Sequence, residues 1–252
     1  MNIYKPLWSY YLFISCSALC LMGLSQLSLG YFDLKQLIFA GLSTFLVYNF
    51  IHWMHSKIKL DFRFLLIVLS GLGLIFTLDA FRPIQLLLLA FSGFLSTLYE
   101  LGPNVQLKGL RYWRFFKLFH ISISWFVLCF LIPGMQSGNQ VIASVIYYLI
   151  FGLSWCFLWA FAFDIRDVNS DKGTLFTLAN YLSTSSQNLL FVLIFVLGGL
   201  SLFFSNSFST VSLAMLIIVF FSCLWAHKIH NSWFYIAFLD GLPILWFCLL
   251  YF

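Results

Sequence analysis

Three aspartates in the second half of the chain are the residues best suited to chemistry. Asp164, Asp167 and Asp171 follow one another at intervals of three and four at the end of an apolar segment. On a helix, residues three and seven positions apart share a face, so their carboxylates are predicted to converge. Converging carboxylate oxygens suit Mg²⁺, which binds one or two carboxylates together with water and phosphate oxygens. A solvated helix end, with Arg166 and Lys172 balancing the acids, is the alternative interpretation.

The segments that must position these acids are strongly apolar. The 252 residues are 62% hydrophobic and only 8% charged, whereas a soluble domain is about a quarter charged. Too few charged side chains are present to cover a water-exposed surface, so the chain suits the hydrocarbon region of a membrane. We therefore predict an all-α polytopic membrane helical bundle, with residues 1–252 forming a single transmembrane domain. The net charge of +5 is attributed to topology signals between apolar segments, so no nucleic-acid partner is expected.

Nine apolar segments approach the roughly twenty residues that a helix needs to cross a bilayer. They cover residues 8–29, 36–54, 62–79, 84–101, 115–133, 141–163, 187–205, 209–227 and 233–252. Lys and Arg accumulate on the cytoplasmic side of short loops. With a cytoplasmic N-terminus, the inner side holds Lys5, Lys57, Lys59, Arg63, Lys108, Arg111, Arg114, Lys117, Arg166, Lys172 and Lys228, and the outer side holds Lys35 and Arg82. We expect an integral protein of a bacterial inner membrane, N-terminus inside, surrounded by membrane lipids.

A basic segment leads into the fifth apolar segment. Lys108, Arg111, Arg114 and Lys117 recur at intervals of three, which places them roughly along one stripe of a helix. Their ordinary role would be anchoring at the inner membrane surface and contact with anionic headgroups.

The spacing of the three aspartates, at the end of the sixth of nine spans, resembles the second aspartate-rich motif of the UbiA-type intramembrane prenyltransferases. The resemblance in topology covers nearly the whole chain. Members of that family transfer a polyprenyl chain from its diphosphate to an acceptor, often an aromatic ring, using Mg²⁺ bound between two aspartate-rich motifs. The resemblance implies that Asp164, Asp167 and Asp171 bind Mg²⁺ and act in catalysis, with a small aromatic or lipid molecule as acceptor. It also implies a diphosphate site made of Lys108, Arg111, Lys117, Arg166, Lys172 and Tyr99.

The first motif of that family, N-D-x-x-D-x-x-x-D, is degenerate at the end of the second span. Asn49 is retained. The aspartate positions are occupied by Phe50, Trp53 and Lys57. Aromatic side chains offer Mg²⁺ no oxygen ligand, so the ordinary two-motif arrangement is not expected. His52 and His55 lie one turn from each other and from Asn49, where they could bind a metal or, with Lys57, neutralise a diphosphate directly.

Asp240 lies within the last apolar segment. An ionised carboxylate costs about 2.5–3.5 kcal/mol there on insertion scales, so it is expected to face the bundle interior. Helix packing through Asp240 and Gly241 is the role expected for this pair.

Two further functions stay open. One is a catalytically impaired isoprenoid- or lipid-binding membrane protein of the same fold, which the loss of the first motif favours. The other is a transporter. It is disfavoured because charged residues within the spans are few and no pair of broken helices stands out in the two halves.

Overall fold

Helices make up almost all of the chain that the structure describes. This computed structural model describes residues 7–54, 62–100, 110, 113, 115–138, 141–168, 175, 177–205, 209–229 and 234–251, and no strand occurs in these ranges. The elements are α1 (Leu7–Ser28), α2 (Leu34–Met54), α3 (Phe62–Ile75), η1 (Leu78–Ala80), α4 (Pro83–Glu100), α5 (Phe116–Phe126), η3 (Val127–Leu131), α6 (Ile132–Gln136), α7 (Ile142–Arg166), α9 (Leu178–Tyr181), α10 (Thr184–Phe204), α11 (Thr210–Ala226), η4 (Phe234–Leu239) and α12 (Leu242–Tyr251). The all-α prediction is confirmed.

Several of these helices suit a membrane. Within the described ranges, five are long and apolar enough to cross one: Tyr10–Ser28, Leu34–Ile51, Phe116–Gln136, Ile142–Arg166 and Thr184–Phe204. Shorter apolar helices cover Phe64–Ile75, Pro83–Tyr99, Thr210–Ala226 and Ala237–Tyr251. A helix satisfies its backbone N–H and C=O groups within one segment, which matters where lipid offers no hydrogen-bond partner. The structure therefore supports a helical membrane bundle, and each of these helices overlaps one apolar segment of the sequence.

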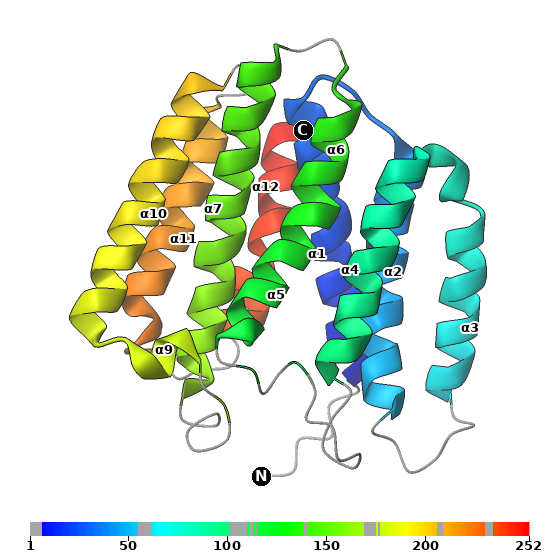
Figure 1. Ribbon diagram of the computed structural model, residues 1–252, viewed down its shortest axis with the longest axis horizontal. Coiled ribbons are helices and arrows are strands. Elements are labelled where there is room, and N and C mark those ends of the chain that lie inside the picture. The colour runs from blue at the N-terminus through cyan, green and yellow to red at the C-terminus, as the bar shows by residue number, and fades with distance from the viewer. Residues whose placement is uncertain are drawn as a thin grey trace.

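The helices lie side by side in one bundle (Figure 1). α7 packs against α5, α10 and α11, and α1 packs against α2 and α12. α2 in turn contacts α3 and α4, so that α3 lies at the periphery. The helices that carry the candidate site, α5 and α7, are in direct contact inside the bundle.

Large aromatic side chains fill the space around α7. Trp155 of α7 and Trp246 of α12 are almost fully buried, with ring centres 6.0 Å apart. Gly152 lets α7 approach the π-helical segment η3, because an added Cβ would lie 2.3 Å from the ring of Phe130. Such close packing fixes the position of α7 relative to the segment that continues α5.

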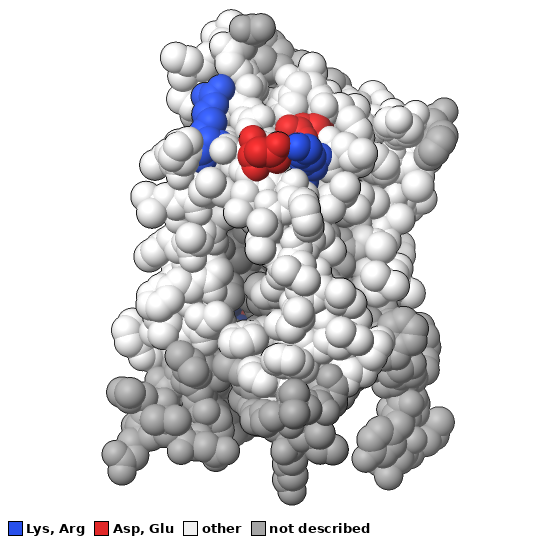
Figure 2. All heavy atoms as spheres, turned by 90° about the vertical axis from the view of Figure 1, so that its right-hand side faces the viewer, with Lys and Arg blue, Asp and Glu red and all other residues white. Residues whose placement is uncertain are grey.

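The outer surface of the bundle is apolar. Large side chains are exposed on α3 and α10, among them Leu69, Leu72, Leu193 and Phe203. Figure 2 shows the α3 side as a wide, largely uncharged surface, with charged side chains gathered near one end of its described part. A surface of this kind suits contact with lipid tails.

Buried glutamines join the helices at the end where α2 and α4 begin. Gln26, Gln36 and Gln85 are fully buried. Gln26 Nε2 donates to Gln36 Oε1 (2.9 Å), and Gln36 Nε2 donates to the Ala80 carbonyl (3.0 Å). Gln85 Nε2 donates to the carbonyl of Ile132 at 3.2 Å. These hydrogen bonds hold η1 and the ends of α1, α2, α4 and α6 together.

The described basic residues divide between the two ends of the bundle. Lys35 and Arg82 lie where α2 and α4 begin, at the upper end in Figure 1. Lys117, Arg166 and Lys228 lie where α5 begins and where α7 and α11 end, at the lower end. This is the separation predicted from the sequence. Which end faces the cytoplasm stays a prediction.

Candidate functional site

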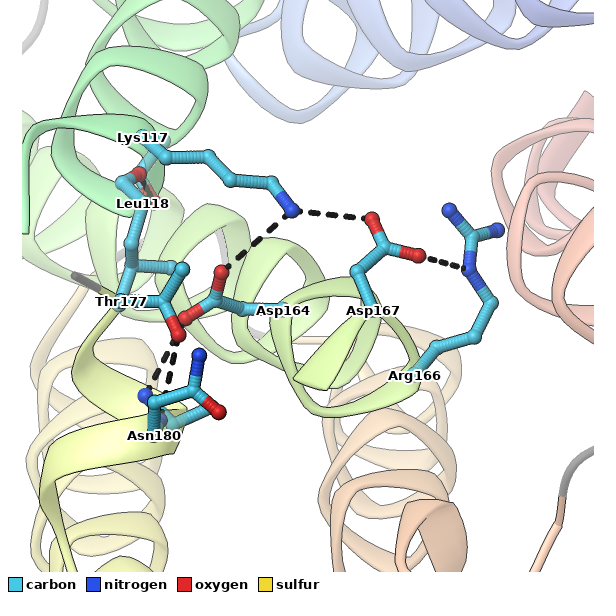
Figure 3. Close-up of polar contacts among 9 residues, drawn as sticks. Lys117, Leu118, Asp164, Arg166, Asp167, Thr177 and Asn180 are labelled. Atoms are coloured by element: carbon cyan, nitrogen blue, oxygen red, sulfur yellow. Dashed lines mark hydrogen bonds and ion pairs between the residues drawn. The ribbon is translucent and has the colours of Figure 1, made fainter. Parts of the chain in front are cut away.

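The start of α5 and the end of α7 bring three predicted site residues together. The ammonium of Lys117 lies 3.0 Å from Oδ2 of Asp167 and 3.7 Å from Oδ1 of Asp164. Figure 3 shows the lysine reaching both carboxylates. α5 begins directly after Phe115, whose φ of 62° is a left-handed conformation that bulky residues rarely adopt. The turn at Phe115 therefore sets the point at which Lys117 enters the bundle.

Asp164 is held by the short helix α9. Its Oδ2 accepts a hydrogen bond from the backbone N–H of Ala179 at 3.3 Å. The Thr177 side chain caps α9 by accepting from the N–H of Asn180 at 3.2 Å (Figure 3). Gln187 Nε2 donates to the Ala179 carbonyl at 2.8 Å and ties α9 to α10. One oxygen of the Asp164 carboxylate is thus oriented toward α9, and the other lies on the Lys117 side.

Arg166 completes a row of alternating charges. Its Nε donates to Oδ1 of Asp167 at 2.7 Å, so Asp167 bridges Arg166 and Lys117 (Figure 3). The guanidinium lies 4.9 Å from the ring centre of Phe163 and 5.3 Å from that of Tyr235. Cation–π attraction to both rings helps to orient it. Two acidic and two basic side chains therefore alternate at this end of the bundle.

An aromatic stack borders Lys117. Tyr99, near the end of α4, stacks on His120 with ring centres 4.8 Å apart. His120 also stacks on Phe116, with ring centres 5.7 Å apart and ring planes 7° apart. The predicted site residue Tyr99 is thus connected to the start of α5. His120 and Tyr235 are absent from the sequence-based candidates, although the three-residue spacing from Lys117 to His120 is a signal that points to His120.

The remnant of the first motif is described only in part. Asn49 of α2 is buried, its Nδ2 donates to the Phe45 carbonyl at 2.8 Å, and its Oδ1 has no hydrogen bond within the described residues. His52 follows one turn later in α2, with only its backbone described. Six further candidates lie outside the described residues: His55, Lys57, Lys108, Arg111, Asp171 and Lys172. α7 ends at Arg166 with Asp167 as its C-terminal cap, and the predicted convergence holds for Asp164 and Asp167, which both contact Lys117.

Two of the three predicted Mg²⁺ ligands lie close enough together to bind one cation. Asp164 and Asp167 already converge on the Lys117 ammonium, and their oxygens are the hard ligands that Mg²⁺ prefers. Within the part of the chain that the structure describes, no group of three His, Cys, Asp or Glu side chains could hold a metal ion. Mg²⁺ needs only one or two carboxylates when water and phosphate supply its other ligands, and the pair meets this requirement.

The pKa of Asp167 is lowered by its neighbours. Burial acts to raise this pKa, but the hydrogen bond from Arg166 and the charges of Lys117 and Arg166 together outweigh burial. A carboxyl group whose pKa is lowered by folding stabilises the fold at pH values above its unfolded-state pKa of about 3.9. This stabilisation is lost as the pH falls from there through the folded-state pKa.

We expect Asp167→Asn to unfold at a lower temperature than the wild type at neutral pH. The difference should shrink below about pH 4, because the wild-type carboxylate then takes up a proton. Thermal unfolding of both proteins in detergent micelles, repeated from neutral to acidic pH, measures the difference. A difference in unfolding temperature that does not change with pH would contradict this expectation.

The comparisons with known proteins contribute no match. No protein-family model, curated protein or solved structure matches the chain.

Proposed function

We propose that this protein is a divergent UbiA-type intramembrane prenyltransferase, which transfers a polyprenyl chain from its diphosphate to an aromatic or lipid acceptor with the help of Mg²⁺. The observation that carries the proposal is the convergence of Asp164 and Asp167 on one cationic centre, the Lys117 ammonium, at the end of an apolar bundle. A diphosphate headgroup is bound by basic side chains and by carboxylates that hold its counter-cation. Its prenyl tail needs apolar surroundings, which the bundle supplies.

In the proposed arrangement all nine apolar segments cross a bacterial inner membrane, and the N-terminus is cytoplasmic. The four shorter apolar helices run beside the five long ones, which supports this count. The division of described basic residues between the two ends supports the orientation. The candidate site would then lie near the cytoplasmic surface, where a diphosphate headgroup can enter from water while its tail lies in the membrane.

Each group of side chains has its own task in this proposal. Asp164 and Asp167, with Asp171, would hold Mg²⁺, which when bound stabilises the charge that develops on the departing diphosphate. Lys117 and Arg166 hold phosphate oxygens through charge-assisted hydrogen bonds. The diphosphate site would be extended by Lys108, Arg111 and Lys172.

The aromatic stack beside Lys117 suits the prenyl end of the substrate. Breaking the allylic C–O bond leaves positive charge on carbon, and aromatic faces stabilise a nearby cation. Tyr99, His120 and Phe116 present stacked rings next to the residues assigned to the diphosphate. They also keep water from the reacting carbon, because His120 and Tyr99 are buried.

Binding of an isoprenoid or lipid diphosphate without turnover is the second candidate, and one observation favours it. At the degenerate first motif, Phe50 and Trp53 pack against each other with ring centres 5.9 Å apart, where the family carries carboxylates. A protein that keeps only the Asp164 side of the site could bind the headgroup without activating it.

Transport is the weakest of the three candidates, because hydrogen bonds close the end of the bundle opposite the site. Gln36 and Gln85 are fully buried there and bond across several helices. Opening this end would exchange each of these hydrogen bonds for hydrogen bonds with water, at a net cost of about 0.5–1.5 kcal/mol for each bond.

A transfer assay separates the three functions. Purified protein in lipid nanodiscs would receive radiolabelled geranylgeranyl diphosphate and a panel of aromatic and lipid acceptors, with Mg²⁺ or with EDTA. Labelled product that forms with Mg²⁺ and disappears with EDTA is the result expected. Binding of the label without any product would contradict prenyl transfer and support the second candidate. Flux of a substrate into liposomes that EDTA does not change would support transport.

A further inference from the structure

A buried acid outside the aspartate motif lies near the candidate site. Asp240 is 2% exposed, and it lies where the last apolar segment changes from the π-helical segment η4 to α12. Helix packing, the role expected from the sequence, does not require a carboxylate at this point. The contacts of Asp240 suggest a chemical task instead.

The backbone around Asp240 departs from a regular helix. The N–H of Asp240 donates to the Tyr235 carbonyl, five residues earlier, at 3.0 Å. Pro243 has no N–H to offer the Leu239 carbonyl, and the indole N–H of Trp159 donates to that carbonyl at 3.2 Å instead. π-helical turns of this kind occur frequently at functional sites, because they redirect a side chain without ending the helix.

The Asp240 side chain is hydrogen-bonded to α1 and interacts electrostatically with groups on two further helices. The Tyr10 hydroxyl on α1 donates to Oδ2 of Asp240 at 3.3 Å, and the Ser17 hydroxyl, also on α1, donates to the Asp240 backbone carbonyl. The charge of Arg166 on α7 acts on Asp240 and on Tyr10. Among the described residues, the hydroxyl of Tyr48 on α2 also interacts electrostatically with Asp240.

Arg166 connects this acid to the candidate site. Its Nε lies 2.7 Å from Oδ1 of Asp167, and its guanidinium lies 5.3 Å from the ring centre of Tyr235, whose carbonyl accepts the Asp240 N–H. A proton taken up at Asp240 removes a negative charge from the surroundings of Arg166, so more of the Arg166 charge acts on a diphosphate bound beside Asp167. Proton uptake at Asp240 would therefore strengthen the positive charge that stabilises the diphosphate as it leaves the allylic carbon.

We propose that Asp240 accepts the proton that the acceptor loses when it is prenylated. This inference rests on the proposed function. It predicts that the acceptor carries a hydroxyl group, which would donate a hydrogen bond to Asp240 as the Tyr10 phenol does. The allylic C–O bond breaks, and its electron pair leaves with the diphosphate. The acceptor oxygen forms a new C–O bond to the allylic carbon, and its proton passes to the Asp240 carboxylate.

The test compares the wild type with Asp240→Asn, whose amide oxygen can still accept the hydrogen bond from Tyr10. With an alcohol or phenol acceptor that is neutral at pH 7, we expect the variant to be at least about 10²-fold slower, because general-base catalysis contributes about 10²–10⁴-fold. The wild-type rate should fall as the pH falls through the pKa of Asp240, since only the ionised form accepts a proton, and the variant should lack this dependence. A dinitrophenolate acceptor, which is ionised at pH 7, should restore the variant rate.

Several outcomes would overturn the inference. A variant with the wild-type rate and pH profile would do so, as would a variant that dinitrophenolate fails to restore. Infrared spectra recorded across pH give an independent readout: a titrating carboxylic-acid band should be present in the wild type and missing from Asp240→Asn, and its absence from the wild type would also overturn the inference. Asp79→Asn, at an exposed acid in η1, is the control that should keep the wild-type rate. A wild type that transfers no prenyl group to any acceptor would instead overturn the proposed function.

Discussion

Replacing Lys117 with methionine is expected to destabilise the fold by about 3–5 kcal/mol. The Lys117 side chain is only 9% exposed, and its ammonium lies 3.0 Å from Asp167 and 3.7 Å from Asp164. Methionine keeps much of the length of the side chain but carries no charge. The buried carboxylates would then have less compensation in surroundings of low dielectric constant. Unfolding in mixed micelles with increasing SDS, followed by far-UV circular dichroism, measures the change in the free energy of unfolding.

A double variant and a surface variant test the reason for this loss. Lys117→Met combined with Asp164→Asn should regain part of the stability, because one carboxylate charge is removed together with the ammonium. Lys35→Met is the matched control. Lys35 pairs with Asp79 where both side chains are more than half exposed, so little stability should be lost. Equal losses in Lys117→Met and Lys35→Met would contradict a buried ionic contact at Lys117.

Asp164→Asn is expected to slow the proposed prenyl transfer by about 10²–10³-fold. The asparagine keeps an oxygen that can accept the hydrogen bond from the Ala179 N–H, so α9 should stay in place. It carries no negative charge, so it holds a cation far less well than aspartate does. The rate would be measured with radiolabelled prenyl diphosphate at saturating Mg²⁺, and gel filtration with circular dichroism would check the fold.

The control for this variant is Asp79→Asn, which makes the same chemical change at the opposite end of the bundle. It should transfer the prenyl group at the wild-type rate. An Asp164→Asn protein that is as active as the wild type would exclude Asp164 from the reaction and would require another explanation for its contact with Lys117.

The sequence alone predicted the apolar helices, but not the short helix α9 (Leu178–Tyr181), which lies between two of the predicted segments. Lipid offers a backbone no hydrogen-bond partner, so an apolar stretch of sufficient length becomes a helix whatever its neighbours are. Boundaries were less certain. The segment predicted to begin at residue 187 begins at Thr184, because the Ser183 side chain caps α10 by accepting from the N–H of Ser186. The sequence also predicted that Asp164 and Asp167 lie together, since three residues span nearly one helical turn.

Only the tertiary structure decided which side chains meet those acids. Lys117 and Asp167 are 50 positions apart, and Tyr10 and Asp240 are 230 positions apart. Residues that face lipid and residues that face another helix are both apolar here, so hydropathy does not identify the buried face of a helix. That face depends on packing, as where Gly152 admits the ring of Phe130. For this reason the sequence alone predicted a helical membrane protein and its acidic motif. The contacts of that motif with Lys117, and the position of Asp240 beside Tyr10, were decided by the folded bundle.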